Sequence, residues 1–167
     1  MVFDVKIEQI VEKPKSIRNI AEEFCNSVPH NLDLGLKILP SQNNEGRIQL
    51  TPTASLVGDP STGQIFNSVL LSMADACAGL TTYLNIKEPM PIATLDLRMD
   101  YLYPAPGDQT ILCVGSCLRM TREIAFIRCM ITTERDAEPI AIGNAVFMLG
   151  TSRRTEMPVD RGAHNAN

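Results

Sequence analysis

Asp75 is the only charged residue between Ile65 and Leu80, a stretch that otherwise holds apolar, small and uncharged polar side chains. Burying a carboxylate costs several kcal/mol unless the group is hydrogen-bonded, paired or protonated. Two explanations for Asp75 are therefore open. The residue has a catalytic role that justifies its position, or its side chain reaches solvent or caps another element.

The same stretch predicts a long helix over about residues 65–82. It contains no proline, it is rich in Leu, Met and Ala, and it is longer than an ordinary strand. Five small or polar residues are spaced four, three, four and three positions apart, so they lie on one stripe of the helix surface. They are Ser68, Ser72, Asp75, Gly79 and Thr82. The remaining surface is apolar, so we expect other structure to enclose most of the helix. The stripe is a functional face or simply the solvent-facing edge, although it carries no Lys or Glu.

After this helix the hydrophobic period changes to two. Residues 92–101 alternate, which predicts one strand face with Ala93, Leu95, Leu97, Met99 and Tyr101 and another with Thr94, Asp96, Arg98 and Asp100. Further strands are predicted at 110–118, 123–133 and 139–149, with connections short enough for an antiparallel meander. Two short strands, 34–39 and 47–51, precede the helix. The pattern predicts an α+β fold in which an antiparallel sheet wraps around one long central helix.

The chain divides into three predicted parts. Residues 1–31 form an N-terminal segment with a helix that begins at Ser16, because apolar residues recur there at helical spacing. Residues 32–150 form the domain with the sheet and the central helix. Residues 151–167 are a polar tail without periodicity, which we expect to be loose. The length of 167 residues fits one domain with a proper core.

The composition excludes several classes of function. A net charge of -4 and a pI near 5.2 argue against a nucleic-acid partner, which favours a basic face. No uncharged apolar run is long enough to span a membrane, and the N-terminus lacks the features of a signal peptide. With 44% hydrophobic and 20% charged residues, the chain is predicted to be a soluble cytoplasmic protein.

The cysteines and histidines point away from metal and triad chemistry. The chain has an odd number of cysteines, and no two of them form a CxxC motif. They are Cys25, Cys77, Cys113, Cys117 and Cys129. Most lie in apolar segments, so we expect reduced, buried thiols and no metal site. We assign His30 to a Pro29-His30-Asn31 turn, and His164 lies in the polar tail. A Ser–His–Asp or Cys–His site is therefore not expected.

Four segments follow one another in a recognisable order: Phe66-Asn67-Ser68, Asp75, Tyr101-Leu102-Tyr103-Pro104-Ala105 and Ala125-Phe126. Their order and spacing resemble the hotdog-fold acyl-CoA thioesterases, especially the PaaI-like (phenylacetate-degradation) branch. That branch has a His-Gly-Gly turn, an Asp or Glu after six further residues, then Tyr-x-x-Pro-Ala and Ala-Phe. The resemblance covers roughly residues 32–149, and the ordered set is more specific than any single motif.

The resemblance implies thioester hydrolysis, with coenzyme A as part of the substrate and no further cofactor. It makes Asp75 the nucleophile or the general base. It also makes the backbone N–H of Asn67, at the helix N-terminus, the group that polarises the thioester carbonyl, because unpaired amides there suit an oxyanion. The hydroxyl of Thr94 is expected to hold the water, although an ordinary β-former on the polar strand face explains Thr94 equally well.

The resemblance also implies a homodimer or a tetramer of two dimers. In such enzymes the helix N-terminus of one subunit faces the carboxylate of the other. Arginine forks suit the phosphates of coenzyme A, and the candidates near strand ends are Arg119, Arg122, Arg153 and Arg154. A solvated surface charge is the stronger explanation for each of these arginines taken individually.

The turn before the helix departs from the family pattern. Phe66 replaces the histidine, and Asn67 and Ser68 replace glycines that let a substrate approach the backbone. Gln64 can substitute for the polar residue of the upstream loop, whose matched place is Pro60, or it is a turn residue. Phe66 contacts an apolar acyl group or belongs to the core. We thus expect substrate contacts at Gln64, Phe66, Ser68 and Arg122.

Three functions stay open at this point. The first is thioester hydrolysis with an altered site. The second is binding of an acyl-CoA or an aromatic ligand without catalysis, which the missing His-Gly-Gly turn favours. The third is hydration or dehydration on a hotdog fold, which needs a histidine paired with the acid and therefore requires His30 beside Asp75.

Overall fold

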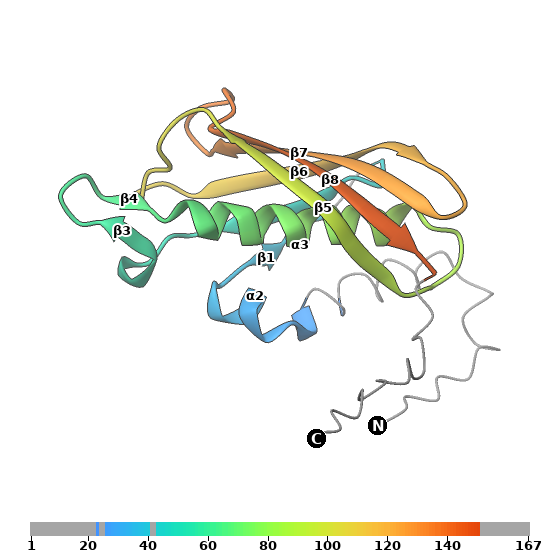
Figure 1. Ribbon diagram of the computed structural model, residues 1–167. Helices are drawn as coiled ribbons and strands as arrows, with labels where there is room; N and C mark the ends of the chain where they lie inside the picture. The colour runs from blue at the N-terminus through green and yellow to red at the C-terminus, as the bar shows by residue number, and fades with distance from the viewer. Residues whose placement is uncertain (1–22, 24–25, 41–42, 151–167) are drawn as a thin grey trace, which may run out of the picture.

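The computed structural model describes residues 23, 26–40 and 43–150 (Figure 1). Within this part of the chain, a six-stranded antiparallel sheet covers one long helix, α3 (Asn67–Asn85). The strands are β1 (Lys37–Ile38), β2 (Gly46–Leu50), β5 (Ile92–Tyr101), β6 (Ile111–Met120), β7 (Ile124–Thr133) and β8 (Ala141–Leu149). The predicted α+β architecture is confirmed.

The strand order differs from the predicted meander. The order across the sheet is β1-β2-β6-β7-β8-β5. Of the four strands that follow α3, only β6, β7 and β8 are neighbours in sequence order, whereas β5 pairs with β8 at the edge of the sheet. The predicted four-strand meander is therefore wrong at β5, because its partner is the last strand of the sheet in sequence and not the next one.

The segment before α3 contains short regular elements. It contains a short 3-10 helix, η2 (Ala54–Leu56), and a small hairpin of β3 (Val57–Asp59) and β4 (Gln64–Ile65). On the N-terminal side, α2 (Pro29–Asp33) begins with proline at a position where the missing N–H is harmless. The predicted helix from Ser16 and the tail 151–167 lie outside the described residues. No described helix is long and apolar enough to cross a membrane.

The buried face of α3 packs on the inner face of the sheet. On the helix it consists mainly of Val69, Leu70, Met73, Ala74, Cys77, Ala78 and Leu80. The opposing strands contribute Ile48, Leu50, Ile111, Ile127 and Ile131, all almost completely buried. Each large aliphatic side chain that is removed from water here stabilises the fold by about 1.5–3 kcal/mol. This contact fixes the rotation of α3 about its axis, so that Ser68 and Asp75 of the stripe are exposed.

Glycines let α3 approach the sheet closely. Gly46 in β2 pairs with Gly115 in β6. A Cβ on Gly115 would overlap Thr81 Oγ1 and lie 3.3 Å from the carbonyl oxygen of Cys77. The Thr81 hydroxyl accepts a 3.2 Å hydrogen bond from the Gly46 N–H and donates a 2.7 Å bond to the Cys77 carbonyl. The helix is thus hydrogen-bonded to the sheet where two neighbouring strands carry no side chain.

Candidate active site

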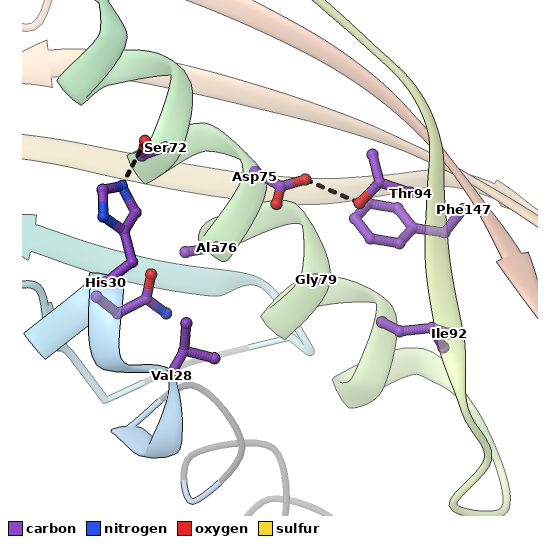
Figure 2. Close-up of a pocket in the computed structure, with 10 residues that line it drawn as sticks. Val28, His30, Ser72, Asp75, Ala76, Gly79, Ile92, Thr94 and Phe147 are labelled. Atoms are coloured by element: carbon purple, nitrogen blue, oxygen red, sulfur yellow. Dashed lines mark hydrogen bonds between the residues drawn. The ribbon is translucent and has the colours of Figure 1, made fainter.

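A pocket of about 240 Å³ lies between α3, the first residues of β5 and the segment that includes α2 (Figure 2). Its polar lining consists of His30, Asn31, Ser72, Asp75 and Thr94, and its apolar wall of Val28, Ala76, Gly79, Ile92 and Phe147. Ser72, Asp75 and Gly79 all belong to the stripe predicted from the sequence. Ser68 lies outside the pocket and is exposed. The stripe does not continue to Thr82, which is fully buried and donates its hydroxyl hydrogen to the Ala78 carbonyl.

The carboxylate of Asp75 is exposed in the described chain. The expected burial penalty therefore does not arise, and the explanation that the side chain reaches solvent is correct for its position. The carboxylate is nevertheless held in place, because Asp75 Oδ1 accepts a 2.9 Å hydrogen bond from Thr94 Oγ1. An accessible carboxylate that is oriented by a hydroxyl can act on a water molecule or on a bound electrophile.

A β-bulge turns Thr94 toward the helix. Thr94 pairs with Phe147 and Asp96 pairs with Val146, so Leu95 is an extra residue in β5. Directly paired residues point to the same side of a sheet, and Phe147 is buried on the inner side. The predicted strict alternation is therefore wrong from residue 93 to 95. Thr94 faces the helix, not the outer face with Asp96, and Leu95 is 51% exposed.

His30 reaches the pocket from α2, on the opposite side of α3 from Thr94 (Figure 2). Its Nε2 lies 3.0 Å from Ser72 Oγ, and Ser72 Oγ donates a 3.1 Å bond to the carbonyl of Ser68. His30 was predicted in a turn and lies in α2, and its contact with Ser72 was not predicted. A hydrogen bond between residues 42 positions apart cannot be predicted from the local sequence. The position of Ser72 on the stripe indicated only that its hydroxyl has a polar partner.

The N-terminus of α3 lies away from this pocket. Asn67 is the first helical residue, so its N–H has no acceptor within the helix. Its carbonyl oxygen accepts a 3.3 Å hydrogen bond from the Tyr101 hydroxyl at the far end of β5. Asn67 precedes Asp75 by eight residues, which corresponds to about 12 Å along the helix axis. The predicted amide and carboxylate therefore do not meet within one subunit.

The predicted substrate contacts are divided between two places. Phe66 is 50% exposed and its ring lies over Gly58, where an added Cβ would come within 2.6 Å of the ring. Gln64 lies in β4 with a bridge to Pro106, and Ser68 is exposed in the first turn of α3. None of these residues lines the Asp75 pocket. They surround the helix N-terminus instead.

Arg122 lies in the turn between β6 and β7. The turn is followed by Ile124, which pairs with Met148 of β8. Met148 also pairs with Ala93 at the start of β5. Arg122 is therefore nearer to the strand end that carries Thr94 than to the helix N-terminus. Of the other arginine candidates, Arg119 is exposed in β6, and Arg153 and Arg154 lie outside the described residues.

Comparison with known proteins identifies the fold. Residues 62–140 match the thioesterase superfamily, and this segment contains α3, β5 and the Asp75–Thr94 pair. The hotdog domain is therefore similar to this superfamily over the segment that carries the predicted site. The matching family is the one that the ordered motifs predicted.

Individual relatives of the chain are distant in sequence. The chain is 25% identical over 154 residues to the medium/long-chain acyl-CoA thioesterase YigI of Salmonella typhimurium, covering 84% of this chain and 98% of that protein. A thioesterase family protein from Silicibacter pomeroyi superposes with a TM-score of 0.73 at 16% identity, covering 81% and 99%. The Escherichia coli PaaI protein superposes with a TM-score of 0.69 at 13% identity, covering 80% and 92%.

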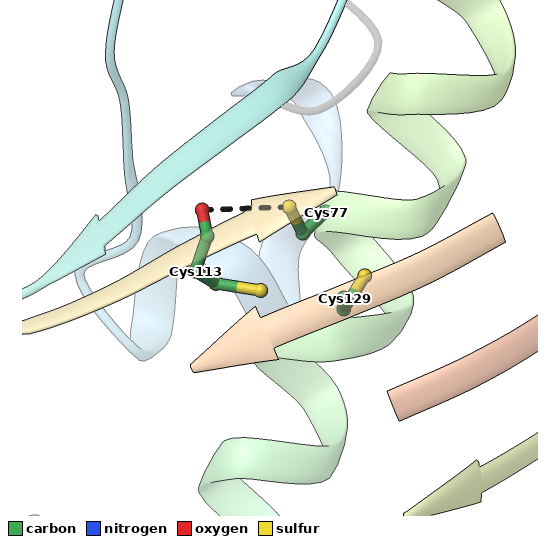
Figure 3. Close-up of side chains that lie close together, drawn as sticks. All are labelled: Cys77, Cys113 and Cys129. Atoms are coloured by element: carbon green, nitrogen blue, oxygen red, sulfur yellow. Dashed lines mark hydrogen bonds between the residues drawn. The ribbon is translucent and has the colours of Figure 1, made fainter. Parts of the chain in front are cut away.

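Three thiols of the hotdog domain meet in its core, between α3 and the sheet (Figure 3). The Sγ atoms of Cys77, Cys113 and Cys129 lie within 4.8 Å of one another, close enough for a soft metal ion. Cys77 donates to the Gly46 and Cys113 carbonyls, and Cys129 donates to the Ala74 carbonyl. Hydrogen bonds with Cys129 and Cys77, together with burial, raise the pKa of the Cys113 thiol well above its usual value. Hydrogen bonds with Cys113 and Cys77 lower the pKa of the Cys129 thiol well below its usual value. The buried sulfurs therefore hold their protons unequally, and they pack under the closely approaching helix.

Proposed function

We propose that the protein hydrolyses acyl-CoA thioesters and that Asp75 is its catalytic carboxylate. The observation that carries the proposal is the accessible Asp75 carboxylate, oriented by Thr94 at the wall of a pocket. As a general base, Asp75 takes a proton from water while the water oxygen attacks the thioester carbon. The C–S bond then breaks and the proton passes to the coenzyme A thiolate. Direct attack by Asp75 through a covalent anhydride gives the same products.

The site is completed by a second subunit. A reacting carbonyl needs the oxyanion donor and the attacking oxygen within about 3 Å of its own atoms. Asn67 N–H and Asp75 of one chain are about 12 Å apart along the helix, so they cannot serve one substrate together. We therefore propose that the Asn67 amide of one subunit faces the Asp75 carboxylate of its partner.

The sheet offers two surfaces for such an assembly. β5 is an edge strand with exposed Leu95, and an unpaired edge is a template for pairing with a second copy. The outer face of the sheet carries exposed Phe126, Met130 and Met148, which is a larger apolar area than isolated surface side chains give. We propose a dimer through β5 and a tetramer through the outer face.

The acyl group that the pocket fits best is apolar. Its wall consists of Ile92, Phe147 and smaller apolar residues, and the named activity of YigI concerns medium and long acyl chains. At about 240 Å³ the pocket lies below the usual size of drug-sized ligand sites, so it holds only part of the substrate. We place the coenzyme A moiety outside it, with Arg122 as a candidate phosphate contact.

The deciding experiment is thiol release from a panel of short-chain, long-chain and aromatic acyl-CoAs. We expect turnover on apolar acyl-CoAs, and a loss of about 10²–10⁴-fold in the Asp75→Ala protein. The matched control is Asp96→Ala, which removes an exposed carboxylate from the outer face of β5. Measurable binding without thiol release from any member would identify a binding protein that has lost hydrolysis.

A second candidate reaction is hydration of an enoyl-CoA. The observation that favours it is His30, which lines the same pocket as Asp75 and so provides an imidazole and an acid at one site. His30 is hydrogen-bonded to Ser72, and no hydrogen bond joins it to Asp75 among the described residues. Following the loss of enoyl absorbance in the same substrate panel distinguishes this reaction from hydrolysis.

A further inference from the structure

We propose that His30 is a positioning residue that acts, through Ser72, on the oxyanion-binding amide of Asn67. The inference rests on the proposed hydrolysis and adds a residue that lies outside the matched family segment, 62–140. A chain of hydrogen bonds connects the His30 imidazole to the first turn of α3, and each link has ordinary hydrogen-bond length.

The first links give the direction of the hydrogen bond between His30 and Ser72. Ser72 Oγ donates its single proton to the Ser68 carbonyl at 3.1 Å. The same oxygen lies 3.0 Å from His30 Nε2, so it accepts there, and Nε2 carries the hydrogen. His30 is thus the donor at the start of the chain, and the Ser72 hydroxyl passes the polarisation to the Ser68 peptide.

The remaining links run through the backbone. The carbonyl of Ser68 belongs to the peptide unit that carries the N–H of Val69. That N–H donates a 3.0 Å bond to the carbonyl of Phe66. The Phe66 carbonyl belongs to the peptide unit that carries the N–H of Asn67. The chain from His30 therefore ends on the amide proposed to hold the oxyanion.

Hydrogen bonds in such a chain polarise one another. A carbonyl that accepts a bond makes the N–H of its own peptide unit a stronger donor, so His30 strengthens the Asn67 donor over two peptide units. The gain matters most when negative charge develops on the thioester oxygen. A contribution confined to the transition state changes kcat and leaves KM nearly unchanged.

The chain also determines which subunit His30 assists. Asn67 is about 12 Å along the helix from Asp75 of its own chain. His30 therefore assists the site that contains the partner's Asp75, although it lines the pocket of its own Asp75. The crossed arrangement makes two roles of His30 distinguishable. As a positioning residue it affects the site with the partner's Asp75, whereas as a structural residue it affects the pocket of its own chain.

The test compares the steady-state kinetics of His30→Ala, Ser72→Ala, the double variant and His30→Gln. We expect kcat to fall about two- to tenfold in each alanine variant with KM unchanged. The double variant should lose no more than either single one, because both break the same chain. Gln also carries an N–H donor, so His30→Gln should keep most of the rate. Unchanged kcat in His30→Ala, or additive losses, would overturn the inference.

Two further measurements complete the test. Leu32→Ala, an exposed position in the same short helix, controls for disturbance of α2 and should keep full kcat. A purified mixed dimer of His30→Ala and Asp75→Ala subunits retains one site that has both Asp75 and a His30-linked amide. We expect that site to work at the wild-type rate, whereas the His30→Ala rate would overturn the crossed arrangement. A wild-type protein that releases no thiol at all contradicts the proposed function itself.

Discussion

Thr94 Oγ1 lies 2.9 Å from Asp75 Oδ1, and the hydroxyl reaches the carboxylate because Leu95 is an extra residue in the edge strand β5. If Leu95 were paired regularly instead, Thr94 would point to the outer face of the sheet, like Asp96. An irregularity of the backbone thus brings a strand residue and a helix residue together at the pocket. Bulges that re-aim a side chain are frequent beside active sites.

Replacing Thr94 with valine should lower kcat and leave the fold intact. Valine has nearly the same shape but no hydroxyl, so the Asp75 carboxylate loses the group that orients it. One hydrogen bond to a charged group is worth about 1.5–3 kcal/mol when fully expressed, and solvent exposure reduces this value. We expect a loss of about three- to thirtyfold in kcat, measured by thiol release.

Two variants show whether this loss is specific. Thr94→Ser keeps the hydroxyl and should retain most of the rate. Thr132→Val makes the same change at a half-buried position in β7, where the buried neighbours Ile131 and Thr133 place residue 132 on the outer face. A Thr94→Val protein with the full wild-type rate would show that the hydrogen bond has no catalytic role.

Deletion of Leu95 should keep the contact between Thr94 and Asp75, because the deletion removes the bulge and not the inward position of Thr94. Without the extra residue, Thr94 directly precedes Asp96, and neighbouring strand residues point to opposite faces, so Thr94 keeps its pairing with Phe147 on the inner side. We expect thiol release to stay above that of Thr94→Val while the far-ultraviolet circular dichroism stays that of a folded protein. A deletion variant less active than Thr94→Val would mean that the backbone of the bulge is itself required for the site.

Hydrophobic periodicity predicted most of the fold. The long helix begins two residues later and ends three residues later than expected, and each long strand was found within two residues of its observed start. These elements depend on local patterns of apolar side chains. The pairing of β5 with β8 does not, because any of several strands can satisfy the same alternation.

The site could be predicted only in part. Asp75 was found because a lone charge in an apolar stretch is a local signal. The inward orientation of Thr94 depends on a bulge, which the alternating sequence of β5 concealed. His30 was missed because its contact with Ser72 joins two segments that are distant in the chain. Long-range geometry, and not residue type, decided both cases.

The hydrogen bond from Tyr101 to the Asn67 carbonyl should give the protein a sensitivity to alkaline pH. Burial raises the pKa of the Tyr101 phenol above its usual value. The protonated form is therefore favoured in the folded state. Its contribution to stability is fully present below about pH 10, the pKa of an unfolded tyrosine, and is lost as the pH rises through the folded pKa. Thermal unfolding of wild type and Tyr101→Phe across this range should show the loss only in the wild type.

Gly115 and Gly79 should respond to alanine in opposite directions. A Cβ on Gly115 overlaps the Thr81 hydroxyl, which is held by its bonds to Gly46 and to the Cys77 carbonyl. Overpacking of this kind costs about 1–3 kcal/mol in the free energy of unfolding. A Cβ on Gly79 meets only the Phe147 ring at 3.9 Å, an ordinary contact, and alanine favours the helix by about 0.5–1 kcal/mol. Urea unfolding of the two variants measures both effects, and a Gly115→Ala protein as stable as wild type would contradict the close approach of α3 to the sheet.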